Sequence, residues 1–394
     1  MPVALRAQTY SILHTFAGPE GANPTGKLTL DGAGNMYGTT SYGGADYLGT
    51  VVRLQHKNSG WLVTPIYTFQ GGSDGGGPGA PVVVGPDGSL YGTTRGGGDP
   101  GCYDTYPCGV VFHLRPPARA PASVIVPWTE SVLYQFTGHG DGVYPSGDLA
   151  FDQAGNLYGT TQLGGVYNGG SIYKLTRSNG GWTESVLYSF RGTGDGEQPY
   201  RGVIADSAGN LYGTAAPDGT SHGTVFELSP SGSGWIETTL YSFSGGSDGG
   251  SPSSGLVFDQ TGNLYGTTLY GGTGNEGTLY KLTPSNGGWT FSVVYSYATY
   301  CEPSGTLVLD GAGNFYGTTF VGGPDQLGSV YKLSPSSGGW TYTDLHDFLG
   351  ACPYPSEDGC LPEGVVMDAA GNLFGMTYEG GETGDGVVFE LTPN

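Results

Sequence analysis

The chain has 394 residues, and its 34 acidic against 13 basic side chains give a formal net charge of −21. So acidic a chain lacks the electrostatic footprint of a nucleic-acid-binding protein and would be repelled by anionic membranes, and no stretch is long and apolar enough to span a bilayer. Hydrophobic residues make up 37%, and the 77 glycines recur at fixed places beside Val, Leu, Tyr and Phe, a pattern that predicts short strands joined by tight turns rather than disorder.

The first eight residues, MPVALRAQ, are too short for a signal peptide. We interpret residues 1–8 as the remnant of one, or as a disordered leader, and assign residues 9–394 to a single domain. The segment that follows, YSILHTF at residues 10–16, has the pattern of a β-strand that returns in every later unit.

An internal repeat runs through the rest of the chain. The motif D-x-x-G-N-L-Y-G-T-T begins at Asp31, Asp152, Asp206, Asp259, Asp310 and Asp368, and a seventh copy at residues 85–94 lacks the leading Asp. The seven copies start 54, 67, 54, 53, 51 and 58 residues apart, and inserts around Cys102–Cys108 and residues 115–127 account for the widest gap. A period of this length indicates a propeller or a solenoid.

Each repeat predicts four strands. An apolar run such as residues 255–259 is followed by the D-x-x-G-N turn, by the strand N-L-Y-G-T-T, and by a glycine-rich loop. A third strand such as residues 223–228 and a second tight turn lead to a fourth strand such as residues 182–190. The fourth strand alternates apolar and polar residues, as expected for an outer edge with one wet face.

Ring closure distinguishes a propeller from a solenoid. The chain ends in a third strand at residues 387–391 with no fourth strand after it, whereas residues 10–16 match the fourth-strand pattern. The N-terminal strand would therefore complete the last blade, and closure removes the exposed edges that a solenoid must cap. The sequence predicts an all-β, seven-bladed β-propeller with four-stranded antiparallel blades.

The five cysteines indicate the compartment. Cys102 and Cys108 flank one short loop, and Cys352 and Cys360 flank another, so we expect two local disulfides and an oxidising environment. Cys301 occupies the repeat position that Cys352 holds one unit later, so it could compete for either partner of that pair. No zinc-type ligand spacing is present, and we expect no metal centre of that kind.

The repeats D-x-x-G-N-L-Y-G-T-T and G-T-V-Y-K-L-T-P, with their variants, resemble over essentially the whole chain those of the bacterial choice-of-anchor tandem repeat GloVer-containing proteins. The resemblance implies an exported protein, usually held at the surface by a C-terminal anchor, although no anchor pattern is evident before Asn394. The family has no established activity, so no catalytic residue is carried over. More loosely, the D-x-x-G-N turns resemble propeller repeats of the NHL and SBBP type.

A carboxylate recurs in the loop before the first strand of each unit. Asp74, Asp141, Asp195 and Asp248 lie in similar Asp-Gly contexts, and Glu20, Glu302 and Asp358 lie at roughly equivalent places. One interpretation is an acidic ring around the channel that binds a cation such as calcium or sugar hydroxyls; the other is that Asp-Gly is favourable turn chemistry, copied with the repeat. Apart from that cation, we expect no cofactor.

Departures from the repeat are the stronger candidates for a site. The long variable loops share one face and gather Arg, His, Tyr and carboxylate side chains in units two to four, where functional loops are expected on a rigid scaffold. The candidate ligand-binding residues are Arg95, His139, Asp141, Tyr144, Arg191, Asp195, Glu197, Tyr200, Arg201 and His222.

Two functions fit this cluster. The first is a secreted or cell-surface binding or scaffold module, a monomer that recognises carbohydrate, including acidic glycans, or a protein partner, with Arg forks for carboxylates and Tyr faces for stacking. The second is a polysaccharide-active hydrolase or lyase, with His222 or a carboxylate as general acid or base. Solvated loops that have simply drifted are the remaining explanation, and the fold does not decide among them.

Overall fold

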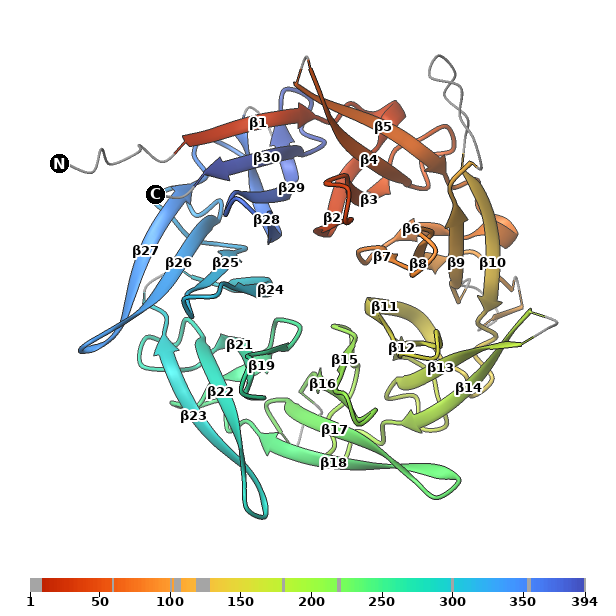
Figure 1. Cartoon of the computed structure of the whole chain (residues 1–394), viewed down its shortest axis with the longest axis vertical. Coiled ribbons are helices and arrows are strands. Elements are labelled where there is room, and N and C mark those ends of the chain that lie inside the picture. The colour runs from red at the N-terminus through yellow and green to blue at the C-terminus, as the bar shows by residue number, and fades with distance from the viewer. Residues whose placement is uncertain are drawn as a thin grey trace.

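The structure, a computed structural model, describes residues 9–58, 60–99, 101–102, 108–117, 128–178, 181–217, 221–298, 301–352 and 356–392. Its strands form seven antiparallel sheets arranged as blades around a common axis (Figure 1). The short 3₁₀ helices η1 (Gly18–Glu20) and η2 (Gly72–Asp74) lie in loops that enter blades 1 and 2. The predicted seven-bladed β-propeller is confirmed.

The blades follow the chain from the innermost to the outermost strand. Blade 1 is built from β2 (Ala22–Leu30), β3 (Met36–Tyr42), β4 (Thr50–Lys57) and β5 (Gly60–Thr68). Blade 2 is built from β6 (Gly76–Pro78), β7 (Val83–Val84), β8 (Leu90–Gly96), β9 (Val110–Arg115) and β10 (Thr129–Gln135). Blade 3 is built from β11 (Val143–Phe151), β12 (Leu157–Leu163), β13 (Ser171–Ser178) and β14 (Gly181–Ser189). Blade 4 is built from β15 (Val203–Ala205), β16 (Leu211–Ala215), β17 (Thr224–Ser231) and β18 (Gly234–Ser242). Blade 5 is built from β19 (Gly250–Pro252), β20 (Val257–Phe258), β21 (Leu264–Tyr270), β22 (Thr278–Ser285) and β23 (Gly288–Ser296). Blade 6 is built from β24 (Pro303–Leu309), β25 (Phe315–Thr319), β26 (Ser329–Ser336) and β27 (Gly339–Asp347). In blades 2 and 5 the innermost strand is split into two short pieces.

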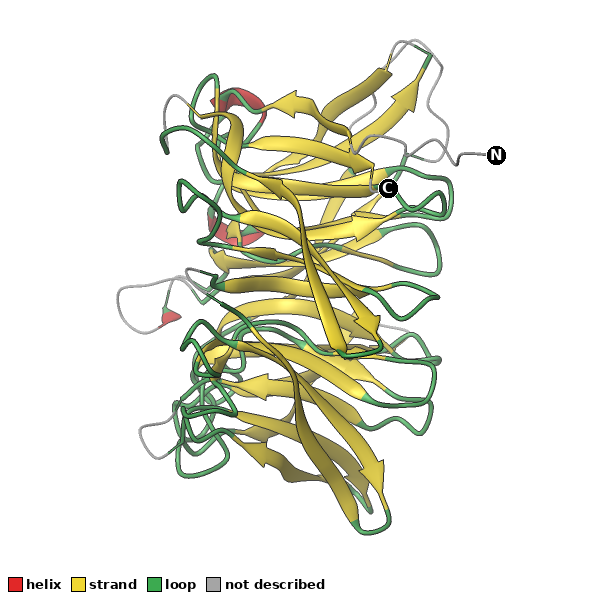
Figure 2. Cartoon of the chain, turned by 90° about the vertical axis from the view of Figure 1, so that its left-hand side faces the viewer, coloured by secondary structure: helices red, strands yellow, loops and turns green. Residues whose placement is uncertain are grey.

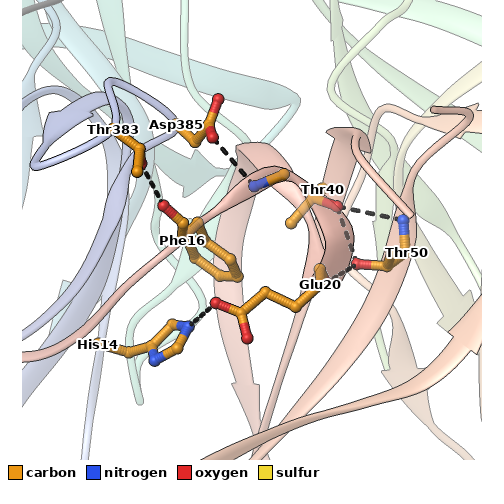
Figure 3. A network of polar contacts seen from close by, with 8 residues as sticks. His14, Phe16, Glu20, Thr40, Thr50, Thr383 and Asp385 are labelled. Carbon is orange, nitrogen blue, oxygen red and sulfur yellow. Dashed lines mark hydrogen bonds and ion pairs between the residues drawn. The ribbon is translucent and has the colours of Figure 1, made fainter. Parts of the chain in front are cut away.

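The ring closes through the N-terminal strand. Blade 7 consists of β28 (Ser356–Met367), β29 (Leu373–Gly381), β30 (Val387–Thr392) and β1 (Thr9–Thr15), and β1 pairs antiparallel with β30 at its outer edge. Figure 3 shows the contacts just beyond β1, where the Gly18 amide donates to Asp385 Oδ2 at 3.0 Å and the Thr383 hydroxyl donates to the Phe16 carbonyl. The predicted closure by residues 10–16 is therefore confirmed. Residues 1–8 lie outside the described part of the chain.

The recurring Asp, Asn and Tyr of the repeat form one hydrogen-bonded turn. In blade 3, Asp152 Oδ1 accepts the amides of Ala154 and Asn156 at 2.9 Å. Its Oδ2 accepts the Asn156 side chain at 2.7 Å and the Tyr158 hydroxyl at 3.0 Å. These bonds satisfy an otherwise open turn and anchor it to the next strand, so the repeat motif belongs to the scaffold.

The same turn in blade 5 shows how strongly the carboxylate is held. Burial of Asp259 acts to raise its pKa, but the hydrogen bonds from Asn263 and Thr261 outweigh burial and lower the pKa to about 2. The charged form is therefore the one that the turn selects.

The hydrophobic core lies between neighbouring blades rather than within one. Between blades 1 and 2, for example, Tyr37, Phe69, Val82, Phe112 and Trp128 belong to one buried cluster. Each blade thus buries both faces of its sheet against its neighbours, which explains why second strands such as β12 are buried along most of their length.

The loops that join second to third strands and the loops that join successive blades lie on one face, which we call the long-loop face. The Gly44 amide donates to the Gly18 carbonyl at 2.9 Å, and the Gly98 amide donates to the Gly72 carbonyl at 2.7 Å. In Figure 2 the short 3₁₀ turns mark this face on the left of the molecule.

Both predicted disulfides are present. Cys102 pairs with Cys108 in the loop after β8, Cys352 pairs with Cys360 at the start of blade 7, and Cys301 lies outside both bridges. Among the described residues, no helix has the length and apolar character needed to cross a bilayer.

Candidate functional site

A cavity of about 1240 Å³ occupies the central channel at the long-loop face. Its wall combines the beginnings of innermost strands, the ends of second strands and the loops of blades 1 and 2. The charged, aromatic and amide side chains that line it are Lys27, Tyr42, Tyr47, Arg95, Asp148, Gln162, Tyr200, Arg201, Glu363 and Tyr378. The size and mixed lining suit a small organic ligand or the end of a larger one.

An ion pair joins two blades at the inner end of this cavity. Lys27 Nζ in blade 1 lies 2.6 Å from Asp148 Oδ2 in blade 3. A second cavity of about 310 Å³ shares Lys27, Asp148, Arg201 and Thr306 with the first and continues along Val203, Leu256 and Leu307 towards the opposite face. The ion pair therefore lies where the two cavities meet and narrows the channel on the side of blade 2.

Arg95 lies against a glycine that makes room for it. A Cβ on Gly79 would stand 2.6 Å from Arg95 Nε. Most other blades carry a hydroxyl residue at the Gly79 position, and Thr25 and Ser253 there donate to the proline carbonyl of the next blade at 3.0 and 2.8 Å. Blade 2 lacks this scaffold hydrogen bond and gains an exposed arginine in the cavity wall.

Arg201 and Glu363 both line the cavity, and the charge of Arg201 acts on Glu363. Burial raises the pKa of Glu363, while the Gly26 amide, which donates to its Oε2 at 2.6 Å, and the charges of Arg201 and Arg95 act to lower it. The Arg201 guanidinium lies 4.9 Å from the centre of the Tyr200 ring, and its buried Nε has no hydrogen-bond partner. Buried donors are normally satisfied, so this N–H is available to an anionic ligand.

Tyr42 and Tyr47 form an aromatic platform at the rim. Their ring centres are 5.8 Å apart and nearly parallel, and the two residues are 46% and 58% exposed, which leaves ring surface open to a ligand. Tyr47 has φ of +60°, in the left-handed region, where the equivalent residues of blades 3 and 5 are Asn168 and Asn275. Asparagine tolerates that region, whereas a bulky side chain there is an outlier.

The loop gains nothing from Tyr47 that would explain its presence. Asn168 Oδ1 accepts the Gly164 amide at 3.1 Å, and Asn275 Oδ1 accepts the Gly271 amide at 3.2 Å. A tyrosine ring cannot accept the equivalent bond in blade 1. The substitution therefore weakens the loop while adding an exposed ring to the cavity rim, which favours a role in binding.

Three of the residues predicted from the sequence, Arg95, Tyr200 and Arg201, meet in the cavity. Asp141 and Asp195 do not, because they are buried at the outer junctions between blades. Asp141 Oδ2 accepts the Tyr134 hydroxyl at 2.8 Å and the Thr137 amide at 2.8 Å. Asp195 Oδ2 accepts the Tyr188 hydroxyl at 2.8 Å.

The same junction recurs around the ring. Tyr67 donates to Asp74, Tyr241 donates to Asp248, and histidines take the place of tyrosine in the pairs His14–Glu20 (Figure 3) and His346–Asp358. These acids join the fourth strand of one blade to the loop that enters the next, and none of them lines the cavity. Their recurrence is explained by this contact, while a cation such as calcium stays a prediction from the sequence.

Three of the described junctions hold a second carboxyl group. One of these groups is Glu237, which lies near Asp195 and whose pKa is raised first by burial; the other two are Glu184 and Glu130. Burial, together with the charge of Asp141, raises the pKa of Glu184 to about 7, and burial with the charge of Asp74 does the same to Glu130. One oxygen of each of the four carboxyl groups at the Glu184 and Glu130 junctions is buried without a hydrogen-bond partner. A proton on the glutamate relieves the repulsion, which makes these junctions sensitive to pH.

The other predicted residues lie on the long-loop face outside the cavity wall. His139, Arg191 and His222 are exposed; Arg191 lies 5.7 Å from the centre of the Tyr167 ring, and His222 Nδ1 lies 2.8 Å from the Tyr270 hydroxyl. The Tyr144 amide donates to the Cys108 carbonyl at 3.0 Å, and Glu197 forms a backbone bridge with Ala216. Ligand binding by these residues stays a prediction.

Sequence reasoning missed Lys27, Asp148, Glu363 and the tyrosines of the rim. A signal for the first three was present in the segment P-[S/T]-G-x that enters each innermost strand. When the innermost strands are aligned on the D-x-x-G-N turn that follows them, Arg201 and Glu363 occupy the position that is Gly26, Gly147 or Gly305 in other blades. Lys27 and Asp148 occupy the next position, which is Gly202, Gly255 or Thr306 in other blades. An alignment of the copies on this segment would have identified these four charged residues as departures from the repeat.

Among the described residues, the one cluster with three metal-type ligands is Cys352, Cys360 and Glu379. Its two sulfur atoms are joined in a disulfide, so they are not thiolate ligands. The channel cavity instead offers cationic donors and aromatic faces, which are the means by which a protein holds an organic anion.

Fold and cavity together define a β-propeller with a charged, aromatic-rimmed pocket at one mouth of its channel. Family comparison matches the Gloeobacter/Verrucomicrobia repeat over residues 3–129, 105–301 and 257–394, and the chain belongs to this family. The family resemblance predicted from the repeats is thereby confirmed. No curated protein sequence matches the chain.

Solved structures are similar in fold. The extracellular domain of a one-component system from B. thetaiotaomicron superposes with a TM-score of 0.55 at 11% identity, over 96% of this chain and 39% of that one. A protein named as a 6-phosphogluconolactonase from Bacteroides uniformis gives 0.52 at 14% identity, over 89% of each chain. At such low identity these similarities show the propeller fold alone.

Proposed function

We propose that this protein is an exported β-propeller that binds an acidic carbohydrate in the channel cavity of its long-loop face. The observation that carries the proposal is the concentration of cations there. The chain has only 13 basic residues and a net charge of −21, yet Lys27, Arg95 and Arg201 converge on one cavity. The cavity holds two acids, of which Asp148 is paired with Lys27.

The remaining lining supports a sugar rather than a simple inorganic anion. Arginine forks suit a uronate carboxylate, Gln162 and Asp148 can bond hydroxyls, and tyrosine rings pack on the apolar faces of sugars while their hydroxyls stay solvated. Export is supported by the two disulfides and by membership of the repeat family.

The test is a binding titration with glucuronate and glucose as paired probes. We expect glucuronate to bind at least about ten-fold more tightly, which corresponds to about 1.4 kcal/mol. The double variant Arg95→Gln/Arg201→Gln should lose that preference, and Arg191→Gln, an exposed arginine outside the cavity, should keep it. Equal binding of both sugars, or a preference that survives in the double variant, would overturn the proposal.

The alternative function is a polysaccharide hydrolase or lyase, and Glu363 is the observation that favours it. Its raised pKa, caused first by burial, would let a protonated carboxyl serve as a general acid beside a bound uronate. Incubation with acidic polysaccharides would then release reducing ends or unsaturated products, and Glu363→Gln would abolish the release. If wild-type protein binds the glycan without product, the protein is a binding module.

A further inference from the structure

The cavity narrows at its inner end, and this bears on how a glycan can occupy it. The cavity opens on the long-loop face, whereas at its inner end the Lys27–Asp148 ion pair, with Nζ and Oδ2 2.6 Å apart, joins blades 1 and 3 and occupies part of the channel. Arg201 and Thr306 adjoin the same boundary. The pair narrows the passage between the two cavities, so a chain end reaches the inner wall more easily than an internal segment, which would have to continue through that passage.

The platform of Tyr42 and Tyr47 lies at the opposite end of the same cavity, on the rim. The two rings are nearly parallel, are about half exposed, and line the cavity together with Arg95. A sugar that stacks on them lies farther out than one whose carboxylate reaches the Arg201 Nε–H. The cavity thus contains two kinds of contact in series, charge at its inner end and aromatic surface at the rim.

We propose that the protein recognises the end of an acidic glycan, with the terminal uronate held between Arg95 and Arg201 and the next sugar stacked on Tyr42 and Tyr47. This inference rests on the proposed function. It adds a second subsite and a terminal, rather than internal, mode of recognition. The left-handed backbone of Tyr47, in a loop that forgoes the hydrogen bond made by Asn168 and Asn275, is then explained by ligand binding.

Isomeric tetrasaccharides test the terminal mode. Each carries a single glucuronate among neutral sugars, placed at the non-reducing end, at the reducing end or inside the chain. One of the two end isomers should bind at least about ten-fold more tightly than the internal isomer, a difference of about 1.4 kcal/mol. If the internal isomer binds as tightly as the better end isomer, the inference is wrong, while the proposed function stands. If neither free glucuronate nor any isomer binds, the proposed function fails, and this inference fails with it.

The variant Tyr47→Asn tests the second subsite without threatening the fold. It installs the residue that blades 3 and 5 already use at this position, so the melting temperature should stay constant or rise by about 1 °C. Affinity for the preferred end isomer should fall about five- to ten-fold, while affinity for free glucuronate stays the same.

Tyr167→Asn is the matched control, because Tyr167 is 55% exposed on the corresponding loop of blade 3 but does not line the cavity. All affinities should be unchanged in this variant. If Tyr47→Asn leaves the tetrasaccharide affinity intact, or weakens free glucuronate to the same extent, the platform is not a sugar subsite.

Discussion

The acids at the blade junctions and the arginines in the channel are both conspicuous in the sequence, but their surroundings differ. Asp195 is buried, and its carboxylate accepts the Tyr188 hydroxyl and the amides of Arg191 and Thr193 at 2.8 to 3.2 Å. Arg201 replaces a residue that is glycine in three other blades, and its buried Nε has no partner. A side chain copied with each blade serves the blade, whereas one that replaces the copied residue serves something outside the scaffold.

Removal of β1 tests the scaffold most severely. Deleting residues 9–16 takes away the outer strand of blade 7 and the backbone ladder from Thr9–Thr392 to Thr15–Val387. The melting temperature should fall by at least about 5 °C, or no folded protein should form. Thermal unfolding followed by circular dichroism measures this, with a deletion of residues 1–8 as the control. Equal melting of the two deletions would contradict ring closure.

A matched pair of substitutions separates the two regions. Asp195→Ala leaves three donors without their acceptor at a buried junction, so the free energy of unfolding should drop by about 2 kcal/mol. Arg201→Ala removes a side chain that makes no junction contact and should change it by no more than about 0.5 kcal/mol. Urea titration gives both values. If Arg201→Ala proves as destabilising as Asp195→Ala, the channel charges are part of the scaffold after all.

The junctions with two carboxyl groups predict an unusual pH dependence. Burial and the charge of Asp141 raise the pKa of Glu184 from 4.5 to about 7, so the folded state favours the protonated group. Its contribution is fully present below pH 4.5 and is lost as the pH rises through 7. The protein should therefore be more stable at pH 5 than at pH 7.5.

Glu184→Gln tests that dependence directly. At pH 7.5 the variant should be more stable than the wild type by about 1 kcal/mol, after discounting for partial exposure, and at pH 4.5 the two should be alike. The exposed residue Glu382 offers the control Glu382→Gln, which should follow the wild type at both values. If the wild type instead gains stability between pH 5 and 7.5 and Glu184→Gln has no effect, the folded state does not favour a protonated Glu184 and the account of this junction is wrong.

Gly79→Ser should have the smallest effect on stability and a clear one on binding. It restores the hydroxyl residue found at this position in other blades, so the free energy of unfolding should stay within about 0.5 kcal/mol of the wild type. Because a Cβ would stand 2.6 Å from Arg95 Nε, the arginine must move and glucuronate should bind several-fold more weakly. Calorimetry that finds unchanged affinity would show that the position of Arg95 does not matter.

The fold was predictable from the sequence because every blade repeats the same local chemistry. The Asp152–Asn156–Tyr158 turn is encoded within seven residues, and the match of residues 10–16 to the fourth-strand pattern defines the closure. The site was only partly predictable. Arg95 and Arg201 were visible as rare basic residues in long loops.

Lys27, Asp148 and Glu363 lie within innermost strands, and only the ring geometry brings residues 121 and more positions apart into one cavity. Conversely, the loop position of Asp141 gave no indication that Tyr134 binds it at a blade junction. The spacing of residues along the chain predicts local turns well, but it does not predict which side chains from different blades lie together.

The most direct measurement of the central claim is a crystal structure of the protein with a tetrasaccharide that ends in glucuronate. The carboxylate should lie between Arg95 and Arg201 above the Lys27–Asp148 ion pair, with the adjoining sugar on Tyr42 and Tyr47. A glycan bound at a blade junction or on the outer strands, with the channel cavity left to solvent, would contradict the claim that the repeat-breaking charges form the site.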